Sequence, residues 1–577
     1  MEKYYDNVRE VTDLKDLINQ TVELYGDNPV FRFKKRMYKK GEEVEFNEMT
    51  YKEFKNEIDS FGTSLNNLGL ENERIALISK NRYEWNVVYY ATTIGDKVIV
   101  PLDKSLPDNE IISLALRSEA KAIVFESKYL EIMKKIKDEK LSNIKYFICF
   151  DFEEDEDGIL SYKKLIQKGK ELINNGNRSH LDAQIDPEKT SILLFTSGTT
   201  SISKAVMLSQ KNICSNVMDL NKVIKFNSND STLALLPFHH AFQALINNVL
   251  VYIGGTMSFC DGLKYIGQNL CEYKPTIIVS VPLILESIHR RILKNIEKQG
   301  KTKIVNRMKK VTNVLDKVHI KLKRNIFSEV HEALGGKVRL IVSGAAAMDI
   351  NLIKSFDDFG IKIVQGYGLT ETSPVISVEN DKDVKRGSVG TPLPSFEVKI
   401  DNSDENGIGE IVVKGSAVMK CYYNNNEATE EVLKGGWFHT GDLGYMENGF
   451  LFITGRKKNV IVQKNGKNIF PEELEVLINY IPGVKESMVY GKPTKDNDLD
   501  VCVKILYDKD AITDIIGYIN ENDIYKYIKE KISEINKKMP PYKHIREITI
   551  TEEEFIKTTT GKIKRHEELA KILGTKD

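Results

Sequence analysis

Four hydroxyl side chains surround a single glycine at the end of an apolar run, and a lysine follows them. The run Ser191–Phe195 leads directly into Thr196, Ser197, Gly198, Thr199 and Thr200, with Lys204 a few residues later. Hydroxyls and backbone N–H groups in such a loop can surround phosphate oxygens, while the lysine adds a positive charge. The spacing is not that of a P-loop ATPase, because Ser203 precedes Lys204 and Ala205 follows it. These residues indicate a phosphate-binding loop, with a serine- and threonine-rich surface turn as the alternative.

A second candidate site follows the apolar run Ile361–Val364, where the chain continues with Gln365, Gly366, Tyr367, Gly368, Leu369, Thr370 and Glu371. The glycines on either side of Tyr367 let the backbone approach a ligand, and the tyrosine ring offers a flat face for a purine. Thr370 provides a hydroxyl for a phosphate, and Glu371 provides a hard oxygen ligand for Mg²⁺. A tight turn around a packed tyrosine is the alternative for these residues.

Two further segments carry charged side chains beside glycines. Asp442 lies in Gly436–Gly444, and its carboxylate can accept hydrogen bonds from both hydroxyls of a ribose. Arg456 follows at short range and could hold the same sugar or a phosphate. Near the end of the chain, Gly561 frees the loop around Lys562 to present an ammonium group into a distant cleft. A charged run near a terminus is usually a solvated face, which is the alternative for Lys562.

Helix-like and strand-like segments alternate along the chain and must position these residues. The apolar periodicity predicts helices over 52–68 and 110–117 and strands over 74–79, 121–125, 191–195, 276–281, 337–342 and 361–364. Such alternation predicts βαβ units and a mostly parallel sheet. The later strands end in loops that contain Gly, Ser or Pro, and open α/β sheets bind ligands at the carboxyl ends of their strands. The fold class is therefore α/β, with the chemistry in these loops.

The sequence pattern changes after residue 385 and again near Arg456. Glycine-punctuated β segments over 397–401 and 409–414 predict a small barrel-like or distorted sheet. From about Arg456 onward the pattern indicates a compact α+β unit with strands over 460–463, 485–490 and 500–506 and helices over 471–480 and 523–537, the first opened by Pro471. We place a domain boundary near Lys458, which gives a large domain over residues 1–457 and a small domain over 458–577.

The composition limits the class of protein. The chain has 577 residues, enough for roughly three or four structural units, and its 83 Lys+Arg balance 83 Asp+Glu. The basic footprint of a nucleic-acid-binding protein is therefore missing. No apolar run is long enough to cross a bilayer, and residues 1–12 lack the apolar core of a secretory signal, so we expect a cytoplasmic protein. Six dispersed cysteines without a C-x-x-C pair indicate buried thiols and no disulfide or zinc framework.

Basic residues concentrate in one helix-compatible stretch, Arg290–Arg324. It holds thirteen Lys/Arg against two acids, Glu297 and Asp316. This local excess on a neutral molecule could dock on anionic lipid, at roughly 1 kcal/mol for each basic residue near the surface. A solvated helical face is the alternative.

Taken together and in this order, the four chemistry-bearing segments resemble the AMP-forming acyl-CoA synthetases of the adenylate-forming superfamily, over about residues 20–570. Within it the chain is most similar to the long-chain fatty acid–CoA ligase branch, through Leu236–His240, Lys274–Pro282, Val342–Ala347 and Asn465–Leu474. The resemblance implies that a carboxylate, here of a medium- to long-chain fatty acid, attacks the α-phosphate of Mg·ATP to give acyl-AMP and pyrophosphate. The thiol of CoA then displaces AMP. A mobile small domain would rotate between these half-reactions about a hinge at Lys458.

The resemblance also implies a role for each candidate residue. Thr196 to Lys204 would hold the β- and γ-phosphates of ATP, Tyr367 would stack on adenine, and Thr370 would contact the α-phosphate. Glu371 would hold Mg²⁺, and Lys562 would reach in from the small domain. The other residues implied in binding are Gly344, Ala345 and Ala346 at the adenine and acyl pockets, Gln365, Gly366 and Gly368 beside Tyr367, Asp442 and Arg456 at the ribose, and Lys458 at the hinge. His240 would lie where the acyl tail and the nucleotide meet, and we interpret His239 and His240 as a pocket wall rather than a zinc site.

Some residues depart from the family pattern. Ser201–Ala205 replaces the usual Gly-x-Pro-Lys-Gly, and Ser209–Gln210 replaces a Ser/Thr-His pair. The lost glycines and proline affect the loop's shape, and so the rate and ATP affinity, more than the type of reaction, because the hydroxyls and Lys204 remain. Three alternatives stay open: transfer of the acyl group to the phosphopantetheine arm of a carrier protein, an aryl- or short-acid CoA ligase, and a non-catalytic nucleotide- or lipid-binding protein.

Overall fold

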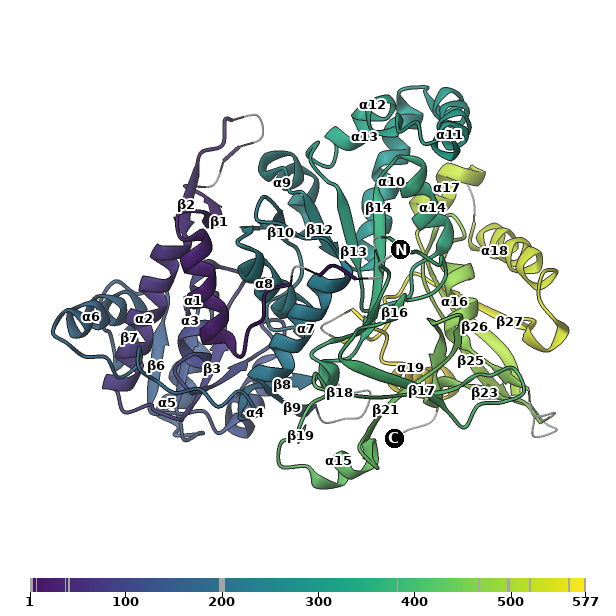
Figure 1. Ribbon diagram of the computed structural model, residues 1–577. Coiled ribbons are helices and arrows are strands. Elements are labelled where there is room, and N and C mark those ends of the chain that lie inside the picture. The colour runs from purple at the N-terminus through teal and green to yellow at the C-terminus, as the bar shows by residue number, and fades with distance from the viewer. Residues whose placement is uncertain are drawn as a thin grey trace.

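Two large mixed sheets form the body of the protein (Figure 1). The computed structural model describes residues 4–6, 8–36, 38–39, 42–196, 203–380, 382–464, 467–494, 499–517, 520–558 and 561–574. Within these residues the first sheet has eight strands in the spatial order β19 (Cys421–Tyr422), β9 (Lys204–Ser209), β8 (Thr190–Thr196), β4 (Val98–Pro101), β3 (Arg74–Ile78), β5 (Ala122–Phe125), β6 (Tyr146–Cys149) and β7 (Ile159–Ser161).

The second large sheet has nine strands in the described residues. Their spatial order is β16 (Thr391–Pro392), β15 (Val375–Val378), β14 (Lys362–Gly368), β13 (Leu340–Ser343), β12 (Ile277–Ser280), β10 (Ser231–Ala234), β11 (Thr256–Phe259), β1 (Pro29–Lys34) and β2 (Phe46–Thr50). The helices that accompany the two sheets are α1 (Leu14–Tyr25), α2 (Tyr51–Asn67), α3 (Tyr83–Thr93), α4 (Asp108–Ser118), α5 (Leu130–Asp138), α6 (Tyr162–Asn174), α7 (Gln210–Val223), α8 (Ala241–Ile253), α9 (Ile266–Tyr273), α10 (Pro282–Lys298), α11 (Thr302–Lys317), α12 (Lys323–Ile326), α13 (Ser328–Glu332) and α14 (Ile350–Asp358).

Both faces of each large sheet are buried. In β12, Ile277 and Val279 join the core between the sheets with α1, α3, α7 and α8, whereas Ile278 joins an outer core with α9, α10 and α14. In β3, Ile75 belongs to the inner core and Ala76 to a third core with α4 and α5. Successive side chains of a strand point to opposite faces, so a strand buried on both faces must be apolar throughout. This explains why the strand-like runs are continuous rather than alternating.

Most of the elements expected from the sequence are confirmed. The strands expected before residue 345 correspond to β3, β5, β8, β12 and β13, and the two expected helices to α2 and α4. The central strand pairs are parallel, and antiparallel pairs lie toward the edges of the sheets. One boundary is wrong, because the strand expected to end at Val364 continues as β14 to Gly368. Beyond β13 its backbone pairs with β15, with Gly366 opposite Val378 and Tyr367 opposite Ser377, so Gln365 to Gly368 lie on a strand and not in a loop.

Smaller sheets follow the two large ones. The barrel-like part expected after residue 385 is a five-stranded antiparallel sheet of β17 (Phe396–Asp401), β18 (Gly409–Gly415), β20 (Leu433–Lys434), β21 (Trp437–Glu447) and β22 (Phe450–Arg456), with α15 (Asn426–Val432) leading into β20. Its strands end where the C-terminal α+β region begins.

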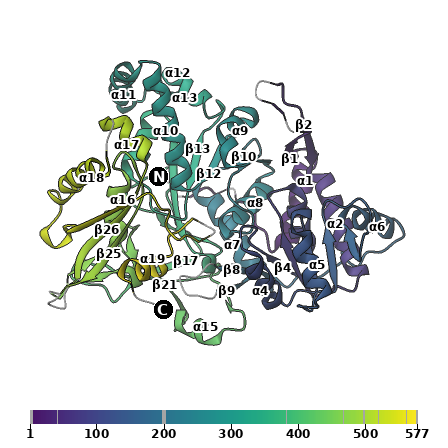
Figure 2. The same cartoon turned by 180° about the vertical axis from the view of Figure 1, so that it is seen from behind.

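The C-terminal region is an α+β unit, as expected. It contains β23 (Ile461–Val462), β24 (Asn468–Ile469), a three-stranded sheet of β25 (Val484–Pro493), β26 (Leu499–Tyr507) and β27 (Glu547–Thr551), and helices α16 (Pro471–Asn479), α17 (Lys509–Ile516), α18 (Glu521–Asn536) and α19 (Arg565–Leu573). Leu474, Val503 and Ile528 belong to a hydrophobic core whose buried members all come from this region. It lies on the right in Figure 1 and on the left in Figure 2.

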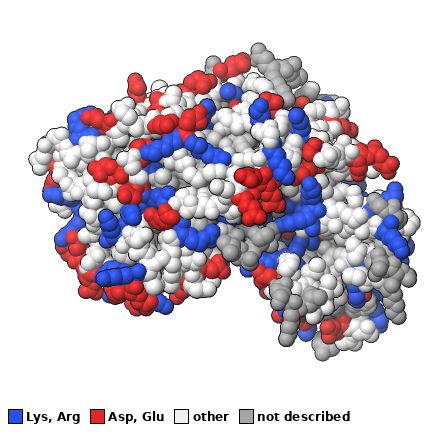
Figure 3. All heavy atoms as spheres, turned by 90° about the horizontal axis from the view of Figure 1, so that it is seen from below, with Lys and Arg blue, Asp and Glu red and all other residues white. Residues whose placement is uncertain are grey.

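The surface charges, the length of the helices and the cysteines agree in part with the expectations from composition. Acidic and basic side chains are interspersed over the face seen in Figure 3, in keeping with the balanced composition. Among the described helices, none is both long and apolar enough to cross a bilayer. All six cysteines are free. The expectation of buried thiols is right for Cys149, Cys214 and Cys502 and wrong for Cys271, which is exposed on α9; Cys260 and Cys421 are partly exposed.

Candidate active site

A buried carboxylate, Asp442, is the centre of the candidate site. It lies on β21 directly opposite Arg456 of β22 in the antiparallel pair. The Arg456 guanidinium contacts Oδ1 of Asp442 from Nε at 2.7 Å, and the Tyr367 hydroxyl donates a hydrogen bond to Oδ2 at 2.7 Å. Burial raises the pKa of Asp442 above its ordinary value, and the positive charge of Arg456 opposes that rise. Two adjacent strands and the end of β14 therefore fix one carboxylate on both of its oxygens.

The path of β14 explains how Tyr367 reaches Asp442. At Gly368 a Cβ atom would lie 1.8 Å from the carbonyl oxygen of Pro374, so only glycine allows the chain to pass there. Behind Tyr367, the backbone N–H of Gln365 donates to Oε2 of the buried Glu379 at 2.9 Å. The strand is thus held on both sides of Tyr367. The tyrosine lies where the pairing of β14 changes from parallel, with β13, to antiparallel, with β15.

Glu371 lies in a 3₁₀ turn, η3 (Thr370–Thr372), and is held by a strand from another part of the chain. The hydroxyl of Tyr422 on β19 donates to Oε1 of Glu371 at 2.8 Å, and the Met419 N–H donates to the Glu371 carbonyl at 2.7 Å. Because β19 pairs with β9, the strand that begins at Lys204, the Lys204 ammonium lies 5.0 Å from the centre of the Tyr422 ring. Tyr422 therefore connects the predicted phosphate loop with the predicted metal ligand.

Three cations, Arg456, Lys458 and Lys562, lie near Asp442, and a fourth, Lys204, lies near Lys458. Lys458, in the short turn η4 (Lys457–Asn459), has its pKa lowered to about 8, first by burial and then by repulsion from Arg456 and Lys204. Burial among protein atoms also lowers the pKa of Lys562, with repulsion from Arg456, although the side chain keeps contact with solvent. Mutual repulsion of this kind is relieved when a polyanion binds between the cations. The arrangement therefore suits a polyphosphate.

Lys562 reaches this cluster from the C-terminal region through a tight turn. Lys557 and Ile563 form an isolated antiparallel bridge, and the N–H of Thr558 donates to the Lys562 carbonyl at 2.8 Å. The N–H of Lys562 in turn donates to the Thr558 hydroxyl at 3.1 Å. Thr558 and Lys562 thus pair across the turn, and Asp442 and Arg456 influence the charge of the Lys562 ammonium.

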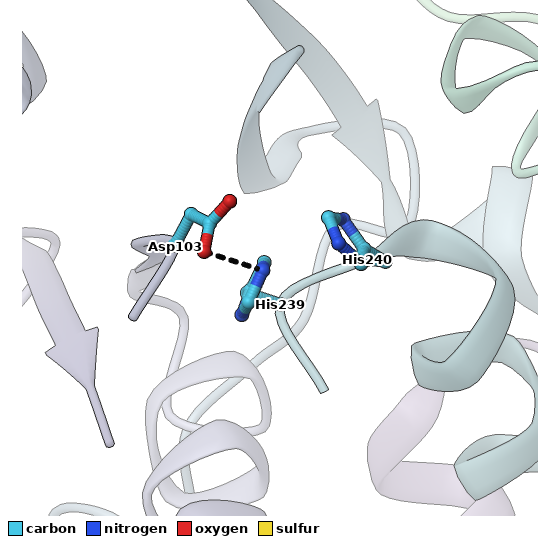
Figure 4. A group of neighbouring side chains, drawn as sticks. All are labelled: Asp103, His239 and His240. Carbon is cyan, nitrogen blue, oxygen red and sulfur yellow. Dashed lines mark ion pairs between the residues drawn. The ribbon is translucent and has the colours of Figure 1, made fainter. Parts of the chain in front are cut away.

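His239 and His240 lie at the start of α8, and Figure 4 shows them beside Asp103. Nε2 of His239 is 3.1 Å from Oδ1 of Asp103, and the two imidazole rings are 4.2 Å apart in an edge-to-face arrangement. Burial, His239 and Lys562 lower the pKa of His240 to about 3, so its ring is neutral at physiological pH. The three side chains are close enough to share a metal ion. Lys562 and Lys104, which disfavour a proton on His240, would disfavour a metal cation for the same reason.

The segment after β13 presents backbone rather than side chains. Ala345 has a φ of +69°, a left-handed conformation that a residue with a Cβ rarely adopts. A Cβ on Gly344 would lie 3.2 Å from the ring of Phe242, so the glycine lets this ring approach closely. Ala345 and Ala346 are exposed. Strained backbone held open in this way is typical of a ligand site.

The predicted phosphate loop is described only at its two ends. Ser197, Gly198, Thr199 and Thr200 lie outside the described residues, as do Ser201 and Ile202. Thr196 and Lys204 are register partners in β8 and β9, and the Thr196 hydroxyl donates to the Lys204 carbonyl at 3.2 Å. Ser203, where the family has proline, is held through its carbonyl by Arg117 at 2.6 Å. The strands on either side of these residues are thus antiparallel neighbours, and Lys204 begins the second of them.

The second departure from the family pattern, Gln210, has a structural explanation. Ser209 caps α7 in a reciprocal capping box with Asn212. The buried Gln210 accepts from the Leu14 N–H at 2.9 Å and donates to the Thr93 carbonyl at 2.8 Å. Gln210 thus joins the start of α7 to α1 and α3 and lies in the core rather than in the site.

Two contact residues of the site were missed from the sequence. Tyr422 lies in a polar segment, Tyr422–Asn425, that has no informative pattern. Asp103 follows β4 closely, so the rule that ligands bind beyond the carboxyl ends of parallel strands could have found it.

This arrangement of cations around a buried carboxylate suits a nucleotide-like polyanion. Residues 19–423 match the family described as AMP-binding enzyme, and the chain belongs to that family.

Named relatives cover most of the chain. Long-chain-fatty-acid–CoA ligase 5 of Rattus norvegicus is 27% identical over 490 residues, 79% of this chain and 71% of that protein. Fatty acyl-CoA synthetase B of Dictyostelium discoideum is 27% identical over 622 aligned residues, 97% of this chain and 89% of that protein. The chloroplastic long-chain-fatty-acid–acyl-carrier-protein ligase AEE15 of Arabidopsis thaliana is 27% identical over 517 residues, 77% of this chain and 71% of that protein.

A solved structure shares the fold over nearly the whole length. The anthranilate CoA ligase AuaEII in complex with anthranoyl-AMP matches with a TM-score of 0.76 at 20% identity, over 99% of this chain and 98% of that chain. The large mixed sheets and the C-terminal α+β region are therefore the fold of that structure.

Proposed function

We propose that the protein activates a medium- to long-chain fatty acid with ATP and transfers the acyl group to the thiol of CoA. The observation that carries the proposal is the cluster of Arg456, Lys458 and Lys562 near the buried Asp442, with Lys204 near Lys458, in a member of the AMP-binding family. The names of the curated relatives support a fatty acid and CoA as substrates.

In the first half-reaction an oxygen of the fatty carboxylate forms a bond to the α-phosphorus of ATP. The bond from that phosphorus to its bridging oxygen breaks, and pyrophosphate leaves with the electron pair. Negative charges repel each other as the carboxylate approaches, so a cation at the reacting atoms lowers the barrier. Lys562 provides this cation. Asp442, which Arg456 and Tyr367 hold in place, accepts hydrogen bonds from the ribose hydroxyls.

The residues present fit a magnesium ion bound together with ATP. Mg²⁺ is usually held by one or two carboxylates plus substrate phosphates. Glu371 offers such a carboxylate: Tyr422 occupies Oε1, and Oε2 makes no hydrogen bond or ion pair with a side chain in the described part of the chain. The ion would supply charge neutralisation at the phosphates. Burial and the adjacent Glu371 raise the pKa of the Tyr422 hydroxyl, so this hydroxyl keeps the proton that it donates to the carboxylate.

In the second half-reaction the CoA thiol loses its proton to solvent and its sulfur bonds to the acyl carbon, while the bond from that carbon to the AMP oxygen breaks and AMP leaves with the electron pair. The thiol attacks a different face of the same adenylate, so a lysine that is required in the first step must leave before the second. We propose that residues 458–577 move as one body about Lys458 between the steps, and the separate hydrophobic core of that region supports this division.

Pyrophosphate release across a series of fatty acids of increasing chain length, with CoA present, tests the proposed function. We expect release that depends on the fatty acid and a thioester product that accumulates with it. Parallel reactions with a phosphopantetheinylated carrier protein in place of CoA distinguish the carrier-dependent alternative, which the AEE15 relative supports. Activity with aryl or short acids alone would replace the fatty acid in the proposal. ATP binding without pyrophosphate release from any acid would contradict the enzyme assignment.

A further inference from the structure

The exposed apolar side chains of this protein concentrate on one stretch of surface. Among the described residues seventeen large hydrophobic side chains are exposed, and eight of them lie between residues 283 and 322. Seven of these eight lie within Arg290–Arg324, the stretch that carries thirteen Lys/Arg against two acids. Scattered exposed apolar side chains are ordinary, but a concentration of them within a strongly basic stretch is not.

The apolar side chains form a stripe along α11 and just beyond its end. Ile304, Val311, Val314 and Val318 are 63%, 49%, 62% and 61% exposed, and their spacing places them on one side of the helix. Three exposed lysines lie along one flank of the stripe: Lys303, Lys310 and Lys317. In the described part of the chain these three lysines have no carboxylate within ion-pair distance. We call this surface the α11 face.

The opposite side of α11 is firmly attached, so the α11 face is turned outward by the fold. Thr312 is buried, and Asn313 donates to Oδ1 of Asp358 at 2.7 Å. The Lys309 ammonium lies 3.9 Å from the centre of the Phe359 ring. These contacts fix the helix on the end of α14. Figure 1 shows α11 at the upper edge of the molecule, in keeping with the exposure of these side chains.

We propose that the α11 face docks on the surface of a lipid bilayer that contains anionic lipid. Aliphatic side chains beside lysines suit the boundary between acyl chains and headgroups, where the aliphatic groups enter and the ammonium groups meet phosphates. Protein interfaces are instead enriched in aromatic residues and depleted in lysine, and residues 290–324 contain no aromatic residue of the Phe, Tyr or Trp type and many lysines. A second copy of the chain would bring the same positive charge against itself. The inference is independent of the proposed enzymatic function.

Vesicle flotation without nucleotide tests the proposal. The probes are vesicles of phosphatidylcholine alone and vesicles with roughly one third phosphatidylglycerol, in about 0.1 M and about 1 M salt. We expect binding to the anionic vesicles at the lower salt, with much weaker binding to neutral vesicles and at the higher salt. Equal partitioning onto both kinds of vesicle, or none onto either, would overturn the proposal.

Variants locate the contact. The triple change Lys303→Ala, Lys310→Ala, Lys317→Ala and, separately, the double change Val314→Ser, Val318→Ser should each weaken binding at least about tenfold. The matched control removes the exposed Lys163, Lys164 and Lys168 of α6, on the opposite side of Figure 1, and should bind like the unmodified protein. Unchanged binding in both α11 variants would also overturn the proposal. Thermal unfolding confirms that each variant is folded.

The tryptophan of a Val314→Trp variant distinguishes insertion into a bilayer from other occupants of the α11 face. Its emission should shift to the blue and be quenched by brominated lipid on anionic vesicles, whereas Leu116→Trp on α4 should not respond. The protein could instead bind neither kind of vesicle and be a dimer by light scattering. If the Val314→Ser, Val318→Ser variant is then a monomer, the α11 face is an interface between two copies. Retention on polyglutamate without vesicle binding would assign it to an acidic protein.

Discussion

The Tyr422 hydroxyl donates a hydrogen bond to Oε1 of Glu371 at 2.8 Å, although the two residues are 51 positions apart in the sequence. The same tyrosine ring lies against Lys204. One side chain therefore touches both the group proposed to hold Mg²⁺ and the lysine proposed to hold phosphates, which makes Tyr422 a positioning residue for the two.

Tyr422→Phe should weaken the binding of Mg²⁺ more than the binding of the nucleotide itself. A hydrogen bond to a charged group contributes about 1.5 kcal/mol or more, so the KM for Mg²⁺ should rise by roughly tenfold. Binding of ATP without Mg²⁺, measured calorimetrically, should change little. Tyr423→Phe is the matched control, because its hydroxyl donates to Glu119 instead, at 2.7 Å. Equal KM values for Mg²⁺ in the two variants would show that Glu371 needs no such support.

Lys562→Ala should slow the first half-reaction far more than the second. Losing one preorganised cation at the α-phosphate is expected to lower the rate of pyrophosphate release by roughly 10²-fold, about 3 kcal/mol. Thioester formation from synthetic acyl-AMP should be nearly unaffected, since Lys562 would then have moved away. Lys564→Ala, whose ammonium pairs with Glu567 at 3.0 Å, serves as the control. A similar loss in both half-reactions would contradict the proposed alternation.

ATP binding should be coupled to proton uptake by Lys458. Its pKa of about 8 leaves the free side chain largely neutral at about pH 9, and a bound polyphosphate should raise that pKa and restore the proton. Calorimetry of ATP binding in buffers of different ionisation enthalpy measures the uptake, which should approach one proton near pH 9 and vanish at about pH 6. In Lys458→Met it should be smaller by the contribution of this lysine. An unchanged uptake in that variant would place the titrating group elsewhere.

The lowered pKa of Lys458 also affects the stability of the folded protein. In the free protein the pKa of Lys458 is below its ordinary value of 10.5, so between about pH 8 and pH 10.5 the unfolded chain binds more protons at this residue. Its contribution to the free energy of unfolding therefore rises with pH across this window and is lowest below it. Comparing Lys458→Met with the unmodified protein by denaturant unfolding at the two ends of the window measures this contribution.

Gln210→Leu should destabilise the fold without a direct effect on the site. The substitution keeps the volume but leaves the Leu14 N–H and the Thr93 carbonyl without their side-chain partner, and one buried unsatisfied group costs about 1–3 kcal/mol. Denaturant unfolding should show a loss of this size or somewhat more. Gln184→Leu, at an exposed position, should be nearly neutral. A neutral Gln210→Leu would mean that other groups take over its hydrogen bonds.

The sequence alone determined the fold class, most of the strands and the main candidate residues. Continuous apolar runs such as Thr276–Val281 are strand signals because both faces of these strands are buried, and burial on both faces leaves no polar position. Asp442, Arg456 and Lys562 were predicted as site residues because a glycine directly precedes each of them, and this pattern is visible in the local sequence. The extension of β14 to Gly368 was missed, since its new partner β15 is set by topology and not by local propensity.

Only the tertiary structure decided which of these residues meet. The Tyr422–Glu371 hydrogen bond depends on β19 pairing with β9, and the Gln210 contacts join three helices, so neither has a signal within a sequence window. The charge of residues 290–324 is plain from composition, but whether the apolar side chains among the lysines are covered depends on how α11 packs on α14. Long-range pairing and exposure are properties of the assembled chain, and local sequence carries little information about either.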